Sequence, residues 1–279
     1  MKLYTIDTGL FKLDGGAMFG VVPRSMWEKL HQPDSKGLCT WAMRCLLIED
    51  GGKLILIDCG LGDKQSEKFF SHYEPHGEDT LHKSLSKYGF HADDITDVVL
   101  THLHFDHCGG AIKREGDKLI PAFKNATYWS HSEHWKWATQ PNAREKASFL
   151  SDNILPIEAS GQLVFADKTN KLLHDAIQLK TVNGHTESMF IPHISYKQQT
   201  IVYAADLFPS MWHIPIPYVM AYDTRPLLTL DEKQRLLQDA VKHNFILYFE
   251  HDPIVSMCSL QQTERGIREK DVLNLSDLA

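Results

Sequence analysis

The sequence predicts a mixed α/β fold. Short apolar segments rich in β-branched residues recur along the chain, as buried strands do, and segments with helical periodicity and capping residues separate them. With 279 residues, 43% hydrophobic and 10% aromatic, the chain can bury a sizeable core. No linker, low-complexity tract or internal repeat interrupts it. We therefore expect residues 1–279 to form a single domain.

The first half of the chain predicts strands at residues 3–8, 40–49, 53–58, 97–101 and 126–130. Asp50-Gly51-Gly52 between the second and third of these is typical of a hairpin. A helix is expected over residues 79–88, with Asp79 as its N-cap and Gly89 at its end. Residues 13–20 are glycine-rich and predict a loop, either an ordinary one or the flexible edge of a pocket. Helical segments follow from residue 131 and over 143–153, and residues 131–153 could form a lid.

The second half predicts strands at residues 162–165, 177–182, 189–195, 200–205 and 245–249. Thr229 and Glu232 have the spacing of a capping box, which predicts a helix from Thr229 to about His243. A last helix is expected over residues 260–272.

Composition excludes several classes of partner and location. The net charge is −7 and the basic residues are scattered, which argues against a nucleic-acid or anionic-membrane partner. Five cysteines without short paired spacing argue against a disulfide framework and favour a reducing compartment. There is no secretory signal pattern and no apolar run of the roughly 18–20 residues that span a bilayer. We expect a cytoplasmic, soluble protein.

The chemistry centres on the segment from Thr101 to Gly110, which follows the apolar strand at 97–101. In an extended backbone, residues two apart point the same way, so His102 and His104 can face one point. Asp106 and His107 follow where the backbone turns. Two imidazoles plus a carboxylate–imidazole pair are the donors expected for two neighbouring zinc-like ions. A His-rich surface loop is the alternative that this spacing disfavours.

Four ligands cannot fill two metal sites, so further ligands must come from elsewhere. Several other predicted strands also end in a metal-capable residue, namely Asp58, His185, Asp206 and His251. Ligands at strand ends gather on a rigid scaffold. Asp58 is expected to orient a ligand from behind rather than only cap a turn.

These motifs resemble those of the metallo-β-lactamase superfamily, and their order covers nearly the whole chain. The resemblance implies an αβ/βα sandwich, a four-layer α+β arrangement in which two mixed β-sheets are flanked by helices. It also implies two divalent metal ions, expected to be Zn²⁺, with Mn, Fe or Co as alternatives. By that pattern the first metal is held by His102, His104 and His185, the second by Asp106, His107 and His251, and Asp206 bridges both. Asp58 and Thr101 are expected behind the ligands.

Within the superfamily, Leu13–Gly20, Ala205–Pro209 and Val219–Asp223 resemble the branch of quorum-quenching N-acyl-homoserine lactonases and methyl-parathion-hydrolase-like enzymes. Two departures stand out. Many relatives read Gly-His-Thr-Pro-Gly where this chain has Glu187-Ser188 after Thr186. Well-studied lactonases carry a Tyr three residues after the bridging Asp, where this chain has Pro209, so a Tyr-assisted mechanism is not carried over.

The expected activity is that of a metal-dependent hydrolase acting on an ester-type bond, a lactone or a related ester or phosphotriester. A hydroxide shared by the two metals would attack the electrophile, with Asp106 and Asp206 as catalytic residues. A glyoxalase II-like thioester hydrolase shares the ligand set and remains open, as does a non-catalytic metal- or ligand-binding protein on this fold. A nuclease, a persulfide dioxygenase and a flavo-diiron enzyme fit the sequence less well.

The expected partner is a small-molecule substrate, and a homodimer is left open. Aromatic and Met side chains predict an apolar pocket for an acyl chain or aromatic group, although each could instead be core. The pocket candidates are Met18, Phe19, Trp27, Phe208, Met211, His213 and Tyr222.

Overall fold

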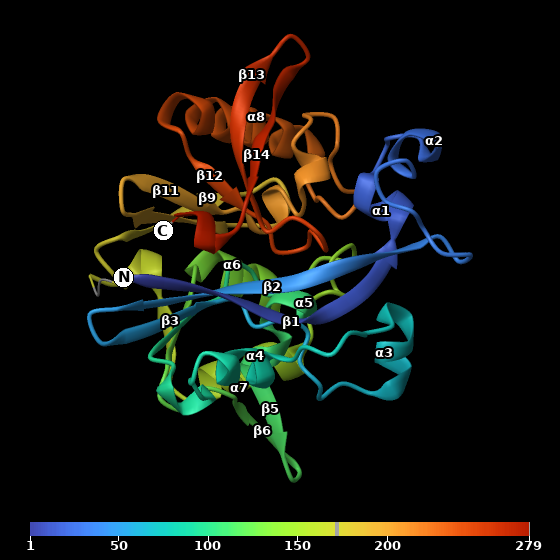
Figure 1. Ribbon diagram of the computed structural model, residues 1–279. Coiled ribbons are helices and arrows are strands. Elements are labelled where there is room, and N and C mark those ends of the chain that lie inside the picture. Colours follow the sequence, from blue (N-terminus) through green and yellow to red (C-terminus); the bar gives the residue numbers. More distant parts are fainter. Residues whose placement is uncertain (171–172, 279) are drawn as a thin grey trace. The chain divides into compact units, whose positions relative to one another are not determined.

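The computed structural model describes residues 1–170 and 173–278, and the chain forms two compact units (Figure 1). The first unit contains residues 1–9, 43–72 and 76–173, and the second contains residues 10–42, 73–75 and 174–279. The expectation that the whole chain is one domain stays a prediction. No helix in the described ranges combines the length and the apolar character needed to cross a membrane.

One mixed sheet has the strand order β1-β2-β3-β4-β7-β8. β2 pairs antiparallel with β3, whereas β3, β4, β7 and β8 are parallel neighbours. The bounds of these strands are Lys2–Asp14, Leu38–Asp50, Lys53–Ile57, Asp97–Val99, Thr127–Ser130 and Leu163–Phe165. A separate hairpin joins β5 (Ile112–Glu115) and β6 (Lys118–Pro121).

A second mixed sheet has the order β14-β13-β12-β11-β10-β9. Only β11 and β12 are parallel; the other neighbours are antiparallel. The strands, from β9 to β14, are Ile177–Val182, Met189–Tyr196, Gln199–Tyr203, Ile246–Tyr248, Met257–Thr263 and Gly266–Leu273. Two mixed sheets with helices confirm the predicted mixed α/β class.

Helices in the first unit surround a core that includes Leu85, Val98 and Ile157. They are α3 (Glu67–Tyr73), α4 (Leu81–Lys87), α5 (Phe105–Cys108), α6 (Ser132–Thr139) and α7 (Ser151–Ala159). In the second unit, α1 (Gly15–Phe19) and α2 (Arg24–Trp27) are short, and α8 (Pro226–His243) packs along β13 and β14 (Figure 1).

Several sequence-based expectations were wrong. The last helix, over 260–272, is instead the hairpin of β13 and β14, whose backbones pair antiparallel from Met257 with Leu273 to Thr263 with Gly266. The glycine-rich loop at 13–20 contains α1, which Asp14 caps by accepting from the Ala17 amide. The helix placed at 143–153 begins only at Ser151.

The capping box at the start of α8 was also wrong. The helix begins at Pro226, where proline is favoured in the first turn, so Thr229 already lies inside it. Glu232 is therefore free of a capping role, and its carboxylate accepts hydrogen bonds from the Asn183 and Gly184 amides.

Candidate metal centre

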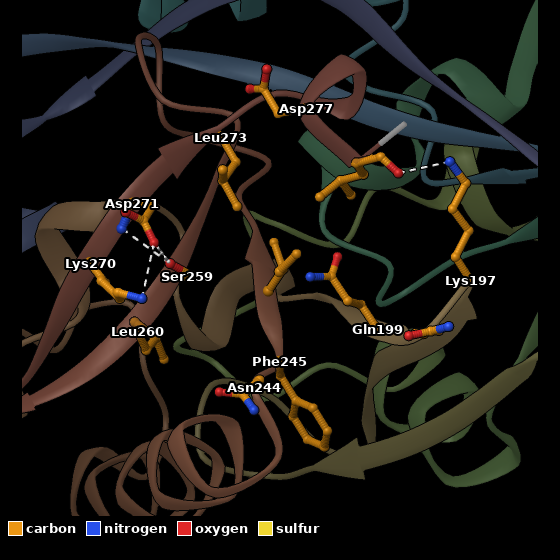
Figure 2. Close-up of a pocket in the computed structure, with 13 residues that line it drawn as sticks. Lys197, Gln199, Asn244, Phe245, Ser259, Leu260, Lys270, Asp271, Leu273 and Asp277 are labelled. Atoms are coloured by element: carbon orange, nitrogen blue, oxygen red, sulfur yellow. Dashed lines mark hydrogen bonds and ion pairs between the residues drawn. The ribbon is translucent and has the colours of Figure 1, made fainter.

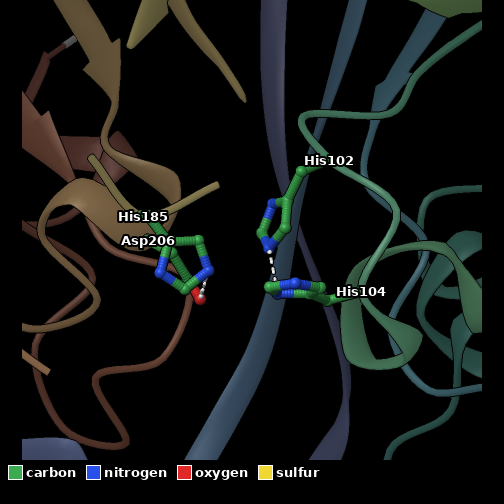
Figure 3. A group of neighbouring side chains, drawn as sticks. All are labelled: His102, His104, His185 and Asp206. Atoms are coloured by element: carbon green, nitrogen blue, oxygen red, sulfur yellow. Dashed lines mark hydrogen bonds and ion pairs between the residues drawn. The ribbon is translucent and has the colours of Figure 1, made fainter. Parts of the chain in front are cut away.

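In the first unit, the end of β4 brings two imidazoles to one point. β4 ends at Val99, and the chain runs extended through His102 and His104 before α5 begins at Phe105. His102 Nε2 lies 3.0 Å from His104 Nδ1, and both side chains are buried (Figure 3). Asp106 and His107 lie in α5, with Asp106 Oδ2 3.8 Å from His107 Nε2.

A single carboxylate behind this segment fixes its geometry. Asp58 follows β3 with φ of +58°, a conformation that a non-glycine residue adopts only under constraint. It accepts from the Thr101 amide at 2.7 Å and from Thr101 Oγ1 at 2.6 Å, and it lies 3.2 Å from His107 Nδ1. Thr101 Oγ1 in turn lies 3.1 Å from His102 Nδ1. Asp58 therefore orients the Nδ1 atoms of both rings, that of His107 directly and that of His102 through Thr101.

His104 is held from a different side, by the segment between α6 and α7. Glu145 Oε1 lies 3.4 Å from His104 Nε2, and its other oxygen accepts from Trp137 Nε1 at 2.6 Å. The Phe149 ring packs against the His104 ring at 4.7 Å between centroids. His134 also supports the motif by accepting the Leu103 amide at 2.8 Å. Residues 131–153 therefore lie against the motif; whether they also move as a lid stays open.

In the second unit, one carboxylate lies between two imidazoles. Asp206 Oδ2 is 3.1 Å from His185 Nε2, and Asp206 Oδ1 is 3.1 Å from His251 Nε2. Figure 3 shows the first of these two pairs. All three side chains are buried. Each oxygen of Asp206 therefore faces its own imidazole.

Both imidazoles are oriented through their other nitrogen. His185 Nδ1 lies 2.7 Å from Asp223 Oδ1, and His251 Nδ1 lies 2.7 Å from the carbonyl oxygen of Ala42. A carboxylate and a carbonyl only accept, so Nδ1 carries the proton and Nε2 presents its lone pair. This outer hydrogen bond is the usual arrangement of a metal-binding histidine.

The donors in both units are of the kind that binds divalent metal ions. The His102 nitrogen that faces His104 carries no proton, because His102 Nδ1 donates to Thr101 Oγ1, whose own proton goes to Asp58. In His185 and His251, the lone pairs face carboxylate oxygens of Asp206. Lone pairs about 3 Å apart repel unless a cation or proton lies between them. The candidate ligands are therefore His102, His104, Asp106 and His107 in the first unit and His185, Asp206 and His251 in the second.

Comparison with known proteins places the chain in a family. The profile of the metallo-beta-lactamase superfamily matches residues 44–241, which is most of the chain. This chain belongs to the metallo-beta-lactamase superfamily. It is 24% identical, over 270 residues, to the N-acyl homoserine lactonase AiiA of Bacillus thuringiensis subsp. kurstaki, a match covering 90% of this chain and 93% of the relative.

Solved structures agree with this assignment. A probable metal-dependent hydrolase from Staphylococcus aureus is 26% identical with a TM-score of 0.87, and 98% of each chain is covered. AidC, a dizinc quorum-quenching lactonase, is 22% identical with a TM-score of 0.77, covering 98% of this chain and 95% of AidC. As a member of this superfamily with lactonase homologues, the protein is a metal-dependent hydrolase.

Glu187 and Ser188, which replace the Pro-Gly of many relatives, lie in a turn that other contacts hold in place. Ser188 has φ of +50°, the left-handed region that favours the glycine of many relatives. Its amide donates to Asn183 Oδ1 at 2.9 Å, which closes the turn around His185. Glu187 pairs with Arg225 at 2.7 Å, and Arg225 also donates to the Asn183 carbonyl. Side-chain contacts hold this turn in place.

Most of the residues predicted to line a pocket lie in the interior of the second unit. Met18, Phe19, Trp27 and Phe208 are buried, and the Phe19 ring stacks on Trp27. Tyr222 is 38% exposed, and Met211 is half-buried. Burial of the first four is compatible with core packing, and their role in lining a substrate pocket stays a prediction.

His213 is buried with both ring nitrogens bonded. Nδ1 lies 2.7 Å from Ser210 Oγ, and Nε2 lies 2.9 Å from the Met18 carbonyl oxygen. Burial lowers the pKa of His213 to about 3, so the ring is neutral. It joins the segment after Asp206 to α1.

A pocket of about 650 Å³ lies elsewhere in the second unit (Figure 2). Lys197, Asn244, Phe245 and Lys270 are among its lining residues, and none of the predicted site residues is. The Lys197 ammonium donates to the Leu278 carbonyl, and the Lys270 ammonium faces Asp271. Both lysines that line this pocket therefore already have partners.

Sequence reasoning missed two carboxylates of this site. Asp223 and Glu145 each face a candidate ligand, yet both lie far from that ligand in the chain. Asp223 lies within the stretch that resembles the lactonase branch, which was the available indication. Glu145 lies in a polar segment with no motif around it.

Proposed function

We propose that the protein binds two divalent metal ions, expected to be Zn²⁺, and hydrolyses a lactone of the N-acyl-homoserine type. In this proposal His102, His104 and His185 hold one ion, and Asp106, His107 and His251 hold the other. Asp206 serves both. The proposal extends to related esters and phosphotriesters, which the same chemistry would cleave.

The position of Asp206 carries the proposal. Its two oxygens face the lone pairs of two imidazoles whose Nδ1 atoms are already committed to Asp223 and Ala42. A carboxylate that only paired with histidines would need both rings protonated inside the protein, which burial disfavours. A carboxylate shared by two metal ions needs neither ring protonated.

Two such ions, when bound, would supply a water of lowered pKa and polarise the oxygen of the electrophile. The chain's own residues prepare for this. Thr101, Asp58 and Asp223 keep His102, His107 and His185 in the tautomers that present a lone pair. Lactonase homologues that act on small molecules support the choice of substrate class.

The test is turnover of a matched panel, with metal content measured on the same sample. The panel contains acyl-homoserine lactones, aryl esters, paraoxon-type triesters and glutathione thioesters. We expect about two metal ions per chain and the fastest turnover with a lactone. Hydrolysis of thioesters alone would establish the glyoxalase II-like alternative. Tight ligand binding without any turnover would favour the non-catalytic alternative.

We also propose a cytoplasmic location, on the pattern of five cysteines that are all free and buried. Fractionation of cells expressing the tagged protein tests this, and recovery from the extracellular medium would contradict it. Whether the protein is a homodimer stays open and is measured by light scattering.

A further inference from the structure

A buried lysine on α8 holds the segment that follows Asp206. Lys233 is fully buried, and its ammonium donates to the carbonyl oxygens of Pro215, Ile216 and Tyr218 at 3.1, 3.3 and 2.7 Å. An ammonium has three N–H donors, so these three carbonyls match its full capacity. The Phe208 ring lies 5.3 Å from the same nitrogen.

The segment needs such a donor because of its own sequence. Residues 214–218 read Ile-Pro-Ile-Pro-Tyr, and the two prolines cannot donate backbone hydrogen bonds. A carbonyl left without a donor in the interior is destabilising. Burial lowers the pKa of Lys233 to about 7, so its charge is unfavourable there unless these carbonyls stabilise it. An apolar side chain would avoid the cost of burying a charge but would leave these three carbonyls without their donor, which points to a positioning role.

The positioned segment connects both ends of the second unit's candidate ligand set. It begins after Asp206 and ends at Asp223, which orients His185. Near its start, the Met211 amide donates to Asp252 at 3.0 Å. Near its end, the Ala221 amide donates to the Ala17 carbonyl oxygen at 2.7 Å.

The neighbouring residue of α8 holds the other loop. Glu232 accepts from the amides of Asn183 and Gly184, the turn that leads to His185. Two consecutive residues of α8 therefore hold two different loops. The Glu232 carboxylate accepts from backbone amides of one loop, and the Lys233 ammonium donates to backbone carbonyls of the other. A Cβ on Gly184 would lie 2.3 Å from Thr229 Oγ1, so this turn also packs directly on α8.

We propose that Lys233 is a positioning residue that sets substrate selectivity by fixing residues 215–218. This rests on the proposed lactonase function. In this proposal residues 215–218 form part of the wall that contacts the acyl chain of a substrate, and fixing the segment gives that wall one shape. Without the ammonium, the three carbonyls turn toward water and the wall loses that shape.

The test compares Lys233→Met with wild type, using a butanoyl and a dodecanoyl homoserine lactone. We expect unchanged metal content, a kcat within about twofold of wild type, and a change of about tenfold in the ratio of kcat/KM values for the two lactones. Lys242→Met, an exposed position of the same helix, serves as the control and should leave the ratio unchanged. A folded, metal-loaded Lys233→Met with the wild-type ratio overturns the proposal.

A second variant covers the case in which Lys233→Met does not fold. Pro217→Gly keeps the lysine but frees the exposed centre of the segment, and it should shift the ratio as well. An unchanged ratio in this variant also contradicts the proposal.

Amide exchange separates this inference from the proposed function. If wild type hydrolyses no lactone, the function proposal fails. Faster exchange at residues 211–222 in Lys233→Met would still support positioning, and unchanged exchange would overturn it.

Discussion

The two halves of the candidate ligand set are constructed differently. In the first unit, four residues within the six from His102 to His107 are local in sequence, and Asp58 anchors two of the three imidazoles directly or through Thr101. In the second unit, His185, Asp206 and His251 follow three different strands. Each of its two imidazoles has its own anchor.

This difference predicts which substitutions would disturb the ligand geometry in each unit. A local segment needs few anchors because its backbone already sets the spacing of its side chains. Dispersed ligands depend on every loop that carries them, so their geometry is spread over many contacts. We therefore expect one anchor to matter greatly in the first unit and several to share the role in the second.

The largest expected effect is that of Asp206→Ala. Because this carboxylate faces both imidazoles of the second unit, its loss should remove metal and lower kcat/KM by more than ~100-fold, beyond what an anchor behind a ligand is worth. Metal analysis and lactone turnover on one sample measure this. Asp239→Asn, exposed on α8, is the control. Turnover retained by metal-free Asp206→Ala would sink the two-metal proposal.

The next effect compares the anchors directly. Asp58→Asn and Asp223→Asn each replace a carboxylate that orients a histidine, and each should weaken metal binding by roughly 10–100-fold. Asp58 supports two imidazoles and Asp223 one, so Asp58→Asn should have the larger effect. Titration with a competing chelator gives both values. Equal losses, or a larger loss for Asp223→Asn, would break the comparison.

We expect the unfolding free energy to fall at acid pH because of His213, a buried residue of the second unit. Its pKa in the fold is about 3, below the ordinary value of 6.5, so the unfolded chain binds a proton there that the folded chain does not. Stability is therefore lost as the pH falls from 6.5 toward 3. Between pH 7 and pH 5 this residue should account for about 2 kcal/mol of lost unfolding free energy.

Urea unfolding of the metal-free protein measures that loss. His213→Gln keeps a donor for the Met18 carbonyl and should show the smaller loss on acidification. The exposed His243→Gln should behave as wild type. If His213→Gln loses as much stability as wild type, another group is responsible.

The smallest expected effect separates backbone strain from anchoring. Both Asp58 and Ser188 have positive φ values, where glycine is more comfortable. Ser188→Gly should raise the unfolding free energy by up to about 1 kcal/mol and leave activity intact, because the bond to Asn183 uses the backbone amide. Asp58→Gly should instead lose metal, because this substitution relieves the backbone strain but also removes the carboxylate that orients the histidines. Thermal unfolding and metal content of the two variants decide between these outcomes.

The sequence predicted most strands of both sheets because buried strands are short, apolar runs between turns. The hairpin at Asp50–Gly52 was placed correctly, since its turn residues permit few other structures. The segment of residues 260–272 was misread as a helix because its sparse apolar residues suit either period until a sheet partner is known. The start of α8 was misplaced because a capping pattern also occurs inside helices.

The sequence by itself determined the identity of the candidate ligands, since residue spacing within His102 to His107 and the residues at later strand ends are local properties. Tertiary structure alone decided which groups stand behind them. Glu145 and Asp223 reach His104 and His185 only because folding places distant loops side by side. Likewise, Lys233 meets the carbonyls of residues 215–218 only through the packing of α8. A sequence motif determines which side chains can bind metal and how they are spaced along the chain. The orientation of those side chains depends on contacts with residues outside the motif.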